Sequence, residues 1–319
     1  MTSIAFVGLG KMGANMARRL AQGGVRAAVY DQNAQTTAEV AKEIGGVAAS
    51  SLADLVSQVQ SPRVIWIMLP SGEVTEKTIA QLQSLLSEGD VLVDGGNSYY
   101  KDSMRRAATL KRNGLLYVDA GVSGGVHGLA NGYCLMVGGE QDAVDRVKPY
   151  LRLLAPVATE GAGSPGAAAG VPGAAGWIHA GPPGAGHFVK MVHNGIEYGM
   201  MQAYAEGFAL MGAKKEFDLD LAEIGEVWRH GSVVRSWLLD LTTDALRDPA
   251  GIAAIEPVVA DSGEGRWTAT EAIEQGVPTP VMSLAVMMRF ATQGRNDFAA
   301  KLLAKMRQGF GGHAVVKKG

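Results

Sequence analysis

A glycine-rich turn between an apolar run and a helical pattern constrains the fold of this chain more than any other feature. Residues 3–8 form an apolar run that ends in glycine, the turn Gly8-Leu9-Gly10-Lys11-Met12-Gly13 fits G-x-G-x-x-G, and a helical pattern continues to about Gln22. In such a turn the first glycine permits a tight bend, the second lets a pyrophosphate approach, and the third allows close helix–strand packing. The segment therefore predicts a dinucleotide-binding turn.

The first half of the chain alternates short apolar runs with helical patterns. Continuous apolar strands that alternate with helices are typical of a parallel sheet covered on both faces. We therefore predict an α/β Rossmann-type dinucleotide-binding domain over residues 1–180. Its expected strands lie at residues 3–8, 25–30, 64–69, 91–94, 115–120 and 133–137, and its expected helices at 12–22, 73–86, 102–111 and 141–153.

The pattern changes beyond residue 160. Residues 161–176 consist almost entirely of Gly, Ala and Pro, which predicts a flexible loop to which we assign no function. After about Pro183 helical periodicity dominates, and it predicts an all-α C-terminal domain over residues 181–319. The expected helices are 186–213, 219–228, 233–246, 266–275, 279–293 and 297–308.

Bulk properties exclude several classes of function. The 319 residues carry a net charge of −2, which gives no general attraction to nucleic acid or to an anionic membrane. No apolar run is long enough for a membrane span, and the N-terminus does not resemble a secretory signal. The single cysteine, Cys134, excludes an internal disulfide and a cysteine metal cluster, and its apolar surroundings predict burial. We expect a cytoplasmic protein that binds no nucleic acid, no membrane and no metal.

An acidic residue bears on the choice of cofactor. Asp31 ends the second apolar run, about 20 residues after the glycine-rich turn, where a carboxylate accepts hydrogen bonds from ribose hydroxyls and repels a 2′-phosphate. The next residues, Gln32 and Asn33, bring no positive charge, and Arg26 lies too early in the strand to replace a phosphate-binding arginine. NAD is therefore expected, with NADP the less favoured cofactor.

A polar stripe runs along the first helical segment of the second domain. At helical spacing Lys190, His193, Asn194 and Glu197 fall within an arc of roughly 100°, with apolar residues on the opposite side. Lys190 and Glu197 lie about 10 Å apart along the axis, which suits the two ends of a sugar-sized ligand. A solvated helix face is the alternative, but the flanking sequence is apolar and rich in glycine. The stripe therefore predicts an acid–base site.

Several motifs together resemble one enzyme family. Besides the turn Gly8–Gly13 they are Asp94-Gly95-Gly96-Asn97-Ser98, Gly121-Val122-Ser123-Gly124-Gly125, the helical segment Gly186–Gly199 and Phe310-Gly311-Gly312-His313. They span nearly the whole chain in the order found in decarboxylating 6-phosphogluconate dehydrogenases, which belong to the β-hydroxyacid dehydrogenases. The segment Lys190–Tyr198 is the most specific, because sister enzymes usually share only its lysine.

The resemblance implies a role for each matching residue. Lys190 matches the family's general base, Glu197 its general acid, and Asn97 a residue that touches both nicotinamide and substrate. The implied cofactor contacts are Gly8, Leu9, Gly10, Met12, Gly13, Asp31, Leu69 and Asn97. The implied substrate contacts are Ser123, Gly124 and Gly125 for the carboxylate, His193 and Asn194 for hydroxyl and carboxylate groups, and Tyr198, Arg289, Arg307 and His313 for the phosphate.

The chain also departs from the family pattern. Longer members carry Lys-Gly-Thr-Gly-Lys-Trp where this chain has Ser-Gly-Glu-Gly-Arg-Trp at residues 262–267, so Ser262 replaces a phosphate-binding lysine. Arg266 is the candidate that compensates for this loss; otherwise the phosphate site is weaker. The helical domain is about half the size of theirs, which resembles the short-chain branch. Residues 161–176 do not match the family pattern.

The implied reaction is oxidation of 6-phospho-D-gluconate at C3, followed by loss of C1 as CO₂ to give D-ribulose 5-phosphate. Neutral Lys190 would take the hydroxyl proton. Glu197 would protonate the enediol at the carbon that becomes C1 of D-ribulose 5-phosphate. Two alternatives stay open: a β-hydroxyacid dehydrogenase for a small unphosphorylated acid, which needs no phosphate pocket and no Glu197, and a non-catalytic NAD-binding sensor. A homo-oligomer, dimer or tetramer, is expected, because the family's C-terminal pair, Arg307 and His313 here, enters the neighbouring subunit's site.

Overall fold

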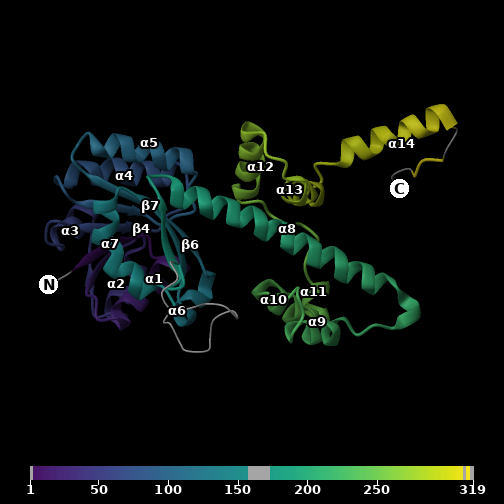
Figure 1. The fold of residues 1–319 in the computed structure, drawn as a ribbon, viewed down its shortest axis with the longest axis horizontal. Coiled ribbons are helices and arrows are strands. Elements are labelled where there is room, and N and C mark those ends of the chain that lie inside the picture. Colours follow the sequence, from purple (N-terminus) through teal and green to yellow (C-terminus); the bar gives the residue numbers. More distant parts are fainter. Residues whose placement is uncertain (1–2, 157–172, 312–313, 317–319) are drawn as a thin grey trace. The chain divides into compact units, whose positions relative to one another are not determined.

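The computed structural model describes residues 3–156, 173–311 and 314–316 (Figure 1). The chain divides into two units, Met1–Met191 and Val192–Gly319, and the helix α8 (Ala185–Ala213) begins in the first and continues into the second. The domain boundary proposed from the sequence, between residues 180 and 181, lies just before this helix. The expected fold class, a Rossmann-type sheet domain followed by helices, is confirmed.

The centre of the first unit is an eight-stranded sheet in the order β3-β2-β1-β4-β5-β6-β7-β8. Strands β1 to β6 run parallel, and the strand order reverses between β1 and β4, which is where dinucleotides bind in folds of this kind. The strands are β1 (Ile4–Val7), β2 (Ala27–Tyr30), β3 (Val47–Ala48), β4 (Val64–Ile67), β5 (Val91–Asp94), β6 (Leu116–Ser123), β7 (Cys134–Gly139) and β8 (Trp177–Gly181).

Strand β7 departs from the parallel sheet expected from the sequence. Residues 118–123 of β6 pair antiparallel with residues 134–139 of β7, and only the short helices η1 (Gly125–His127) and α6 (Gly128–Asn131) lie between them. A parallel pair requires a crossover of a dozen or more residues, so this short connection reverses the chain instead. β8, which the sequence pattern did not indicate, then pairs parallel with β7. Of residues 161–176, only 173–176 are described, and they form a turn before β8.

Helices cover both faces of the sheet, as Figure 1 shows. Successive strand residues face opposite sides, so Phe6 packs on one face and Val7 on the other, and both sides of the strand must be apolar. α1 (Lys11–Gln22), α2 (Ala34–Glu43) and α7 (Gln141–Leu154) contribute to the first core, and α3 (Leu52–Ser57), α4 (Glu73–Leu85) and α5 (Tyr100–Lys111) to the second. The sequence patterns did not indicate α2, β3 or α3.

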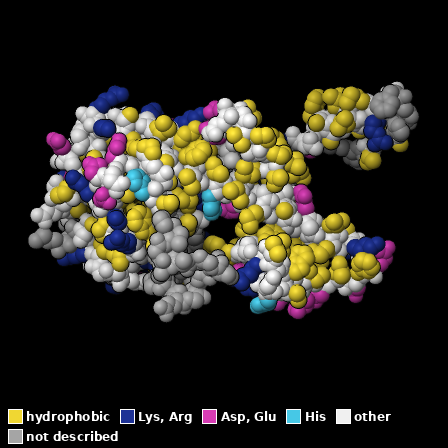
Figure 2. All heavy atoms as spheres, in the orientation of Figure 1, with side chains coloured by type: hydrophobic (Ala, Val, Ile, Leu, Met, Phe, Trp, Pro, Cys, Tyr) yellow, Lys and Arg dark blue, Asp and Glu magenta, His cyan; other side chains and the backbone are white. Residues whose placement is uncertain are grey.

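The regular elements in the described part of the second unit are all helices. Few of its large apolar side chains are buried. Leu210, Ile255, Ile273 and Phe298, for example, are 72–81% exposed. Hydrophobic side chains accordingly occupy much of the surface of these helices in Figure 2. No helix among the described residues combines the length and the apolar character needed to cross a membrane. The elements after α8 are η2 (Lys215–Phe217), α9 (Leu221–Arg229), α10 (Trp237–Leu246), α11 (Pro249–Ala253), α12 (Glu264–Gln275), α13 (Pro280–Thr292) and α14 (Asp297–Gly311).

A buried arginine joins α1 to the end of α7. The Arg19 guanidinium, in a residue only 8% exposed, donates to the carbonyls of Leu153, Leu154 and Ala155 at 2.7–3.1 Å and to that of Leu129 at 3.0 Å. The last carbonyls of a helix lack intrahelical partners and carry partial negative charge. Arg19 therefore satisfies these groups and complements the helix dipole.

We predict that Arg19→Met lowers the free energy of unfolding by about 2–4 kcal/mol, because buried carbonyls lose their donors. The neighbouring Arg18 is a matched control, since its ion pair with Glu43 at 2.6 Å is solvent-accessible and contributes under about 1 kcal/mol. Denaturant unfolding of the two variants measures the difference. Equal losses for Arg18→Met and Arg19→Met would contradict this account of Arg19.

Candidate active site

The glycine-rich turn after β1 has the shape that a dinucleotide requires. Gly8 has φ +90°, and a Cβ atom there would collide with the Met68 carbonyl. A Cβ atom on Gly13 would collide with the Gly8 carbonyl, whereas one on Gly10 would meet no atom within 4 Å. Gly10 is the N-cap of α1, and no side chain caps this helix start. The open space beside Gly10 and the uncapped N–H groups together fit a pyrophosphate.

Asp31 ties the turn to the end of β2. Its Oδ2 atom accepts a hydrogen bond from the Leu9 amide at 2.7 Å, and its Oδ1 atom accepts one from the Asn33 amide at 2.9 Å. A carboxylate has lone pairs beyond these two hydrogen bonds and can also accept from a ribose hydroxyl. The ribose contact of Asp31 stays a prediction, and the hydrogen bond by which Asp31 holds the glycine-rich turn was not expected from the sequence.

Leu69 lies between the turn after β1 and the turn after β5. Its Cδ2 atom is 2.8 Å from the position that a Cβ atom of Gly8 would occupy. Its carbonyl oxygen is 2.6 Å from the position that a Cβ atom of Gly96 would occupy. Asn97, the next residue after Gly96, is exposed. Met12 is half-buried in the first turn of α1. The cofactor contacts expected on β1, β4 and β5 therefore lie at one edge of the sheet.

A buried ion pair shapes the turn that carries Asn97. Asp94, at the end of β5, accepts from the Gly96 amide at 3.1 Å, the Ser98 hydroxyl at 2.9 Å and the Arg106 guanidinium at 2.7 Å. Burial lowers the pKa of Arg106, but the negative charges of Asp94 and Glu76 outweigh this and raise it above its ordinary value. The guanidinium therefore stays charged and fixes the Asp94 carboxylate. The carboxylate then fixes Gly96 and Ser98, the residues on either side of Asn97.

The first turn of α8 is attached directly to β6. The buried carboxylate of Asp119 on β6 accepts from the Gly184 amide at 2.6 Å and from the His187 amide at 2.8 Å, which satisfies N–H groups at the helix start. A Cβ atom on Gly121 would collide with the Cβ atom of Lys190. Lys190 is 8% exposed. The glycine thus permits a close approach that fixes the Lys190 backbone against the sheet.

Lys190 lies near the substrate loop expected at Ser123–Gly125. Cys134 stands opposite Ser123 in the antiparallel pair of β6 and β7. Burial raises the pKa of the Cys134 thiol, and the positive charge of Lys190 acts in the opposite direction. The residue as a whole is exposed, so the burial expected for Cys134 is wrong: it lies at the start of its strand, before the buried part. Gly124 and Gly125, with φ +130° and +54°, turn the chain away from β6.

The remainder of the polar stripe lies on the part of α8 that belongs to the second unit. His193 Nδ1 is 3.2 Å from Asn194 Oδ1 and 3.8 Å from Glu197 Oε2. Asn194 is buried, whereas the side chains of His193 and Glu197 are 39% and 40% exposed. An imidazole and a carboxylate therefore face each other one helical turn apart, with an amide beside them.

Tyr198 and Arg289 meet within the second unit. Tyr198 is buried against α13, and the Arg289 guanidinium lies 3.4 Å from the centre of its ring. The Tyr198 hydroxyl is 3.3 Å from the Ser262 hydroxyl, which donates to the buried carboxylate of Glu264 at 2.6 Å. Glu264 is a residue that the sequence argument missed, since nothing in one sequence signals that its carboxylate is buried beside Tyr198.

The expected phosphate contacts are brought together only in part. Arg266, the candidate to replace the missing lysine, is exposed and forms an ion pair with Asp261 at 2.7 Å. Arg307 is exposed on α14, and His313 lies outside the described residues. In the part of the chain that the structure describes, no three His, Cys, Asp or Glu side chains gather as a metal site.

Comparison with known proteins identifies the family. Residues 3–163 match the NAD binding domain of 6-phosphogluconate dehydrogenase, and residues 186–316 match the C-terminal domain of 6-phosphogluconate dehydrogenase. The chain belongs to the 6-phosphogluconate dehydrogenase family. The family resemblance predicted from the sequence motifs is thereby confirmed.

Individual 6-phosphogluconate dehydrogenases match most of the chain. It is 38% identical to the NAD⁺-dependent, decarboxylating enzyme of Haloferax volcanii, over 99% of each chain. It is 35% identical to the NAD⁺-dependent, decarboxylating enzyme of Bacillus subtilis (strain 168), over 92% of this chain and 62% of that one. The solved 6-phosphogluconate dehydrogenase of Plasmodium falciparum, studied with NADP⁺ and with 6-phosphogluconate, has a TM-score of 0.81 at 28% identity, over 99% of this chain and 66% of that one.

We predict that Gly10→Ala weakens NAD binding about tenfold or more, because the new methyl group enters the space that the pyrophosphate needs. Folding stability should hold, since Gly10 has φ −61° and no atom within 4 Å of the new Cβ position. Isothermal titration with NAD measures the change in Kd. Gly207→Ala on α8, which also meets no atom within 4 Å, is the control. Unchanged affinity of Gly10→Ala would exclude this turn as the pyrophosphate site.

Proposed function

We propose that this chain oxidises 6-phospho-D-gluconate and removes C1 as CO₂, which gives D-ribulose 5-phosphate, with NAD as cofactor. The observation that carries the proposal is α8: Lys190 is held on β6 at the start of the helix, and Glu197 follows two turns later, about 10 Å along the axis. The similarity to the NAD⁺-dependent, decarboxylating enzyme of Haloferax volcanii over 99% of each chain supports it.

The residues proposed to hold NAD lie at the edge of the sheet where β1, β4 and β5 end. When bound, NAD supplies a nicotinamide ring that accepts the hydride from the substrate. The carboxylate of Asp31 favours a ribose hydroxyl over a 2′-phosphate, so NAD is preferred to NADP. A cytoplasmic location is part of the proposal, because sugar-acid phosphates and NAD are cytoplasmic metabolites. The cofactor-binding residues are Gly8, Leu9, Gly10, Met12, Gly13, Asp31, Leu69 and Asn97.

Lys190 is the proposed general base. Its neutral amine takes the proton of the C3 hydroxyl while that carbon is oxidised, and the amine becomes an ammonium group. The ammonium then donates a hydrogen bond to the new C3 carbonyl, which accepts the electron pair when the bond between C1 and C2 breaks. Because the carbonyl lies β to the carboxylate, this single donor is enough to draw the electrons away from the departing CO₂.

Glu197 is the proposed general acid. Loss of CO₂ leaves an enediol, and its terminal carbon must gain a proton to give ribulose 5-phosphate. A protonated Glu197 carboxyl group donates it from a position two turns farther along the same helix. His193, whose Nδ1 atom is 3.8 Å from Glu197 Oε2, is positioned to exchange a proton with this carboxyl group. Seven residues along one helix thus separate the site of oxidation from the site of protonation.

The remaining groups are proposed to bind the two ends of the substrate. Ser123, Gly124 and Gly125 hold the carboxylate, and His193 and Asn194 contact the hydroxyl groups and the carboxylate. The phosphate is held by Tyr198, Arg289, Arg307 and His313. Ser262 contributes no charge, so binding of the phosphate depends on arginines, which can make bidentate contacts.

One observation favours the second candidate, a β-hydroxyacid dehydrogenase for an unphosphorylated acid. The carboxylate of Glu264 is 3% exposed and lies two hydrogen bonds from the Tyr198 hydroxyl, where its charge opposes a phosphate. Steady-state kinetics of the wild-type protein with 6-phosphogluconate and with small hydroxyacids, using NAD and NADP in turn and detecting CO₂, separates the two. Activity with neither substrate class would favour a non-catalytic NAD sensor.

We predict that Lys190→Met and Glu197→Gln each lower kcat for 6-phosphogluconate by about 10²–10⁴-fold, the usual contribution of a positioned acid or base. NAD affinity should stay near that of the wild type, because neither side chain is proposed to bind the cofactor. The matched controls are Lys148→Met, a half-buried lysine on α7, and Glu206→Gln, an exposed glutamate on α8. Turnover at wild-type level in Lys190→Met would refute the assignment of the base.

We also propose that the chain acts as a homo-oligomer, a dimer or a tetramer, whose C-terminal segment completes a neighbouring site. The second unit supports this, because its described residues bury few large apolar side chains and expose many. Many exposed large apolar side chains within one unit are typical of a protein that forms an interface. Arg307 is exposed on α14, close to the end of the chain, where it can reach a second copy.

Complementation between two inactive variants tests the contribution of Arg307 to a neighbouring site. In mixed dimers of Lys190→Ala and Arg307→Ala, one site would carry both defects and the other neither, so an equal mixture should regain about a quarter of wild-type activity. Each variant refolded alone is the control. A mixture that regains nothing, although sedimentation shows mixed oligomers, would place Arg307 in the site of its own chain or outside it.

A further inference from the structure

A chain of buried polar side chains connects the start of α8 with the end of β5. The Nδ1 atom of His187 on α8 lies 2.7 Å from the hydroxyl of Ser103 on α5. Ser103 also hydrogen-bonds the side chain of Tyr117 on β6, whose hydroxyl donates to Asp94 at 3.2 Å. All four residues are at most 4% exposed. The helix with Lys190 and the turn with Asn97 are therefore linked through the interior of the first unit.

The acceptor at one end determines the direction of every hydrogen bond in this chain. Asp94 is ion-paired with Arg106 and acts only as an acceptor, so Tyr117 must donate to it. The Tyr117 oxygen then accepts from Ser103, whose other possible acceptor, the Tyr99 carbonyl, lies farther away at 3.4 Å. Ser103 in turn accepts from His187. His187 therefore carries its proton on Nδ1. Its Nε2 atom is left as a buried acceptor that has no hydrogen-bond partner among the described residues.

Tyr117 is kept as a permanent donor by its surroundings. Burial raises the pKa of Tyr117 well above its ordinary value, and the negative charges of Asp94 and Asp119 raise it further. The phenol therefore stays protonated at neutral pH, so its donation to Asp94 is maintained.

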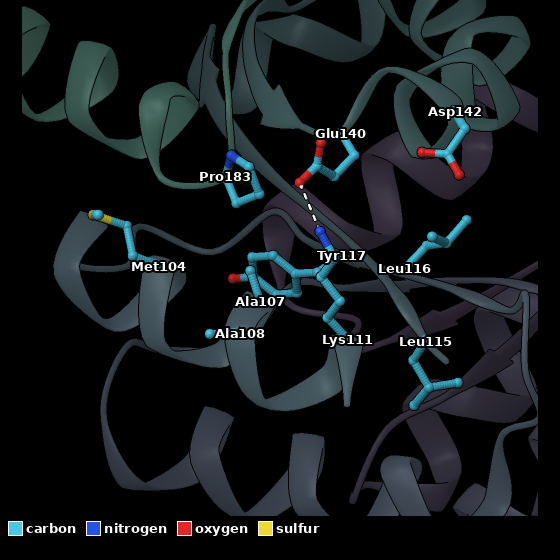
Figure 3. Close-up of a pocket in the computed structure, with 10 residues that line it drawn as sticks. All are labelled: Met104, Ala107, Ala108, Lys111, Leu115, Leu116, Tyr117, Glu140, Asp142 and Pro183. Atoms are coloured by element: carbon cyan, nitrogen blue, oxygen red, sulfur yellow. Dashed lines mark hydrogen bonds and ion pairs between the residues drawn. The ribbon is translucent and has the colours of Figure 1, made fainter. Parts of the chain in front are cut away.

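Packing alone does not hold Tyr117 in place. Its side chain lines a hollow of about 460 Å³ between α5, β6 and the start of α7, which Figure 3 shows with Lys111 and Glu140 paired at 3.3 Å across it. The ring also packs in the second core of the sheet, so only one side of the residue borders this hollow. The hydrogen bonds to Ser103 and Asp94 therefore add to packing in fixing the position of its hydroxyl group.

The unsatisfied Nε2 atom indicates that His187 is not present for stability. A buried polar atom without a partner destabilises the folded state, and an apolar side chain of similar size would avoid that cost. His187 lies one helical turn before Lys190, and its own amide is held by Asp119 at 2.8 Å. The imidazole thus belongs to the turn of α8 that directly precedes Lys190, and the position of this turn sets the direction of the Lys190 side chain.

We propose that His187, Ser103 and Tyr117 are positioning residues that couple the helix carrying Lys190 to the turn carrying Asn97. The inference rests on the proposed function for the roles of Lys190 and Asn97. Each link transmits the position of the next: His187 sets α8 relative to α5, and Tyr117 sets Asp94, which shapes the turn. Lys190, the proposed base, and Asn97, the proposed nicotinamide contact, thereby keep a fixed position relative to each other.

Turnover of single variants tests the coupling. Ser103→Ala and Tyr117→Phe should each lower kcat about tenfold or more, with KM for 6-phosphogluconate and Kd for NAD within about twofold of the wild type, because a small misplacement affects chemistry more than binding. Tyr133→Phe is the matched control, since Tyr133 is also buried but its hydroxyl has no partner among the described residues. Equal effects of Tyr117→Phe and Tyr133→Phe would overturn the proposal.

Two further comparisons separate positioning from a general loss of structure. The double variant Ser103→Ala/Tyr117→Phe should be no worse than the more impaired single variant, because either change breaks the same chain; additive losses would contradict it. His187→Asn, which can place an amide N–H near the Nδ1 position, should retain turnover within about threefold of the wild type, whereas His187→Leu should resemble Ser103→Ala. Equal impairment of the two His187 variants would also count against the proposal.

Hydrogen exchange without substrate makes failure of this inference distinguishable from failure of the proposed function. Ser103→Ala should accelerate amide exchange both at residues 184–190 and at residues 95–98, although Ser103 lies in neither segment. Acceleration at both segments supports the coupling even if the wild-type protein does not turn over 6-phosphogluconate. Acceleration confined to one segment would overturn it, whatever the activity.

Discussion

The attachment of α8 to β6 is the interaction on which the rest of the site depends. A side chain at Gly121 would push the helix away from the sheet, and the Asp119 carboxylate closes the helix start by accepting two of its amide protons. The first constraint acts on the Gly186 carbonyl and the base of the Lys190 side chain, and the second on backbone amides, so together they locate Lys190 independently of its flexible end. The spacing between Lys190 and the later polar groups along α8 follows from helical geometry.

Local features of the sequence predicted the local features of the fold. The glycine pattern at residues 8–13 predicted a turn whose glycines meet their expected neighbours, and apolar runs predicted β1, β2 and β4 to β7 within a few residues. Short or weakly apolar elements such as β3 and β8 carry no such signal. The direction of β7 also escaped prediction, because it depends on the length of a connection rather than on the composition of the strand.

The supporting groups of the site were invisible in the sequence for a different reason. Arg19, Asp119, His187 and Glu264 are polar residues in segments whose pattern already has a structural interpretation, and their partners lie 2 to 136 positions away. Only the folded chain shows that these partners are close and that water is excluded. Lys190 and Glu197, by contrast, could be proposed from the sequence, since helical spacing and the family motif point to the same two positions, and their roles stay predictions.

Helix α8 belongs to both units, and this has a consequence for how such a chain can change over time. Exchange of the residues from 192 onward for those of a relative would replace Glu197, the proposed acid, and the groups proposed to bind the far end of the substrate. The nucleotide turn and Lys190, the proposed base, would be inherited intact. A new specificity can therefore arise by recombination within a helix, without rebuilding the redox half of the protein.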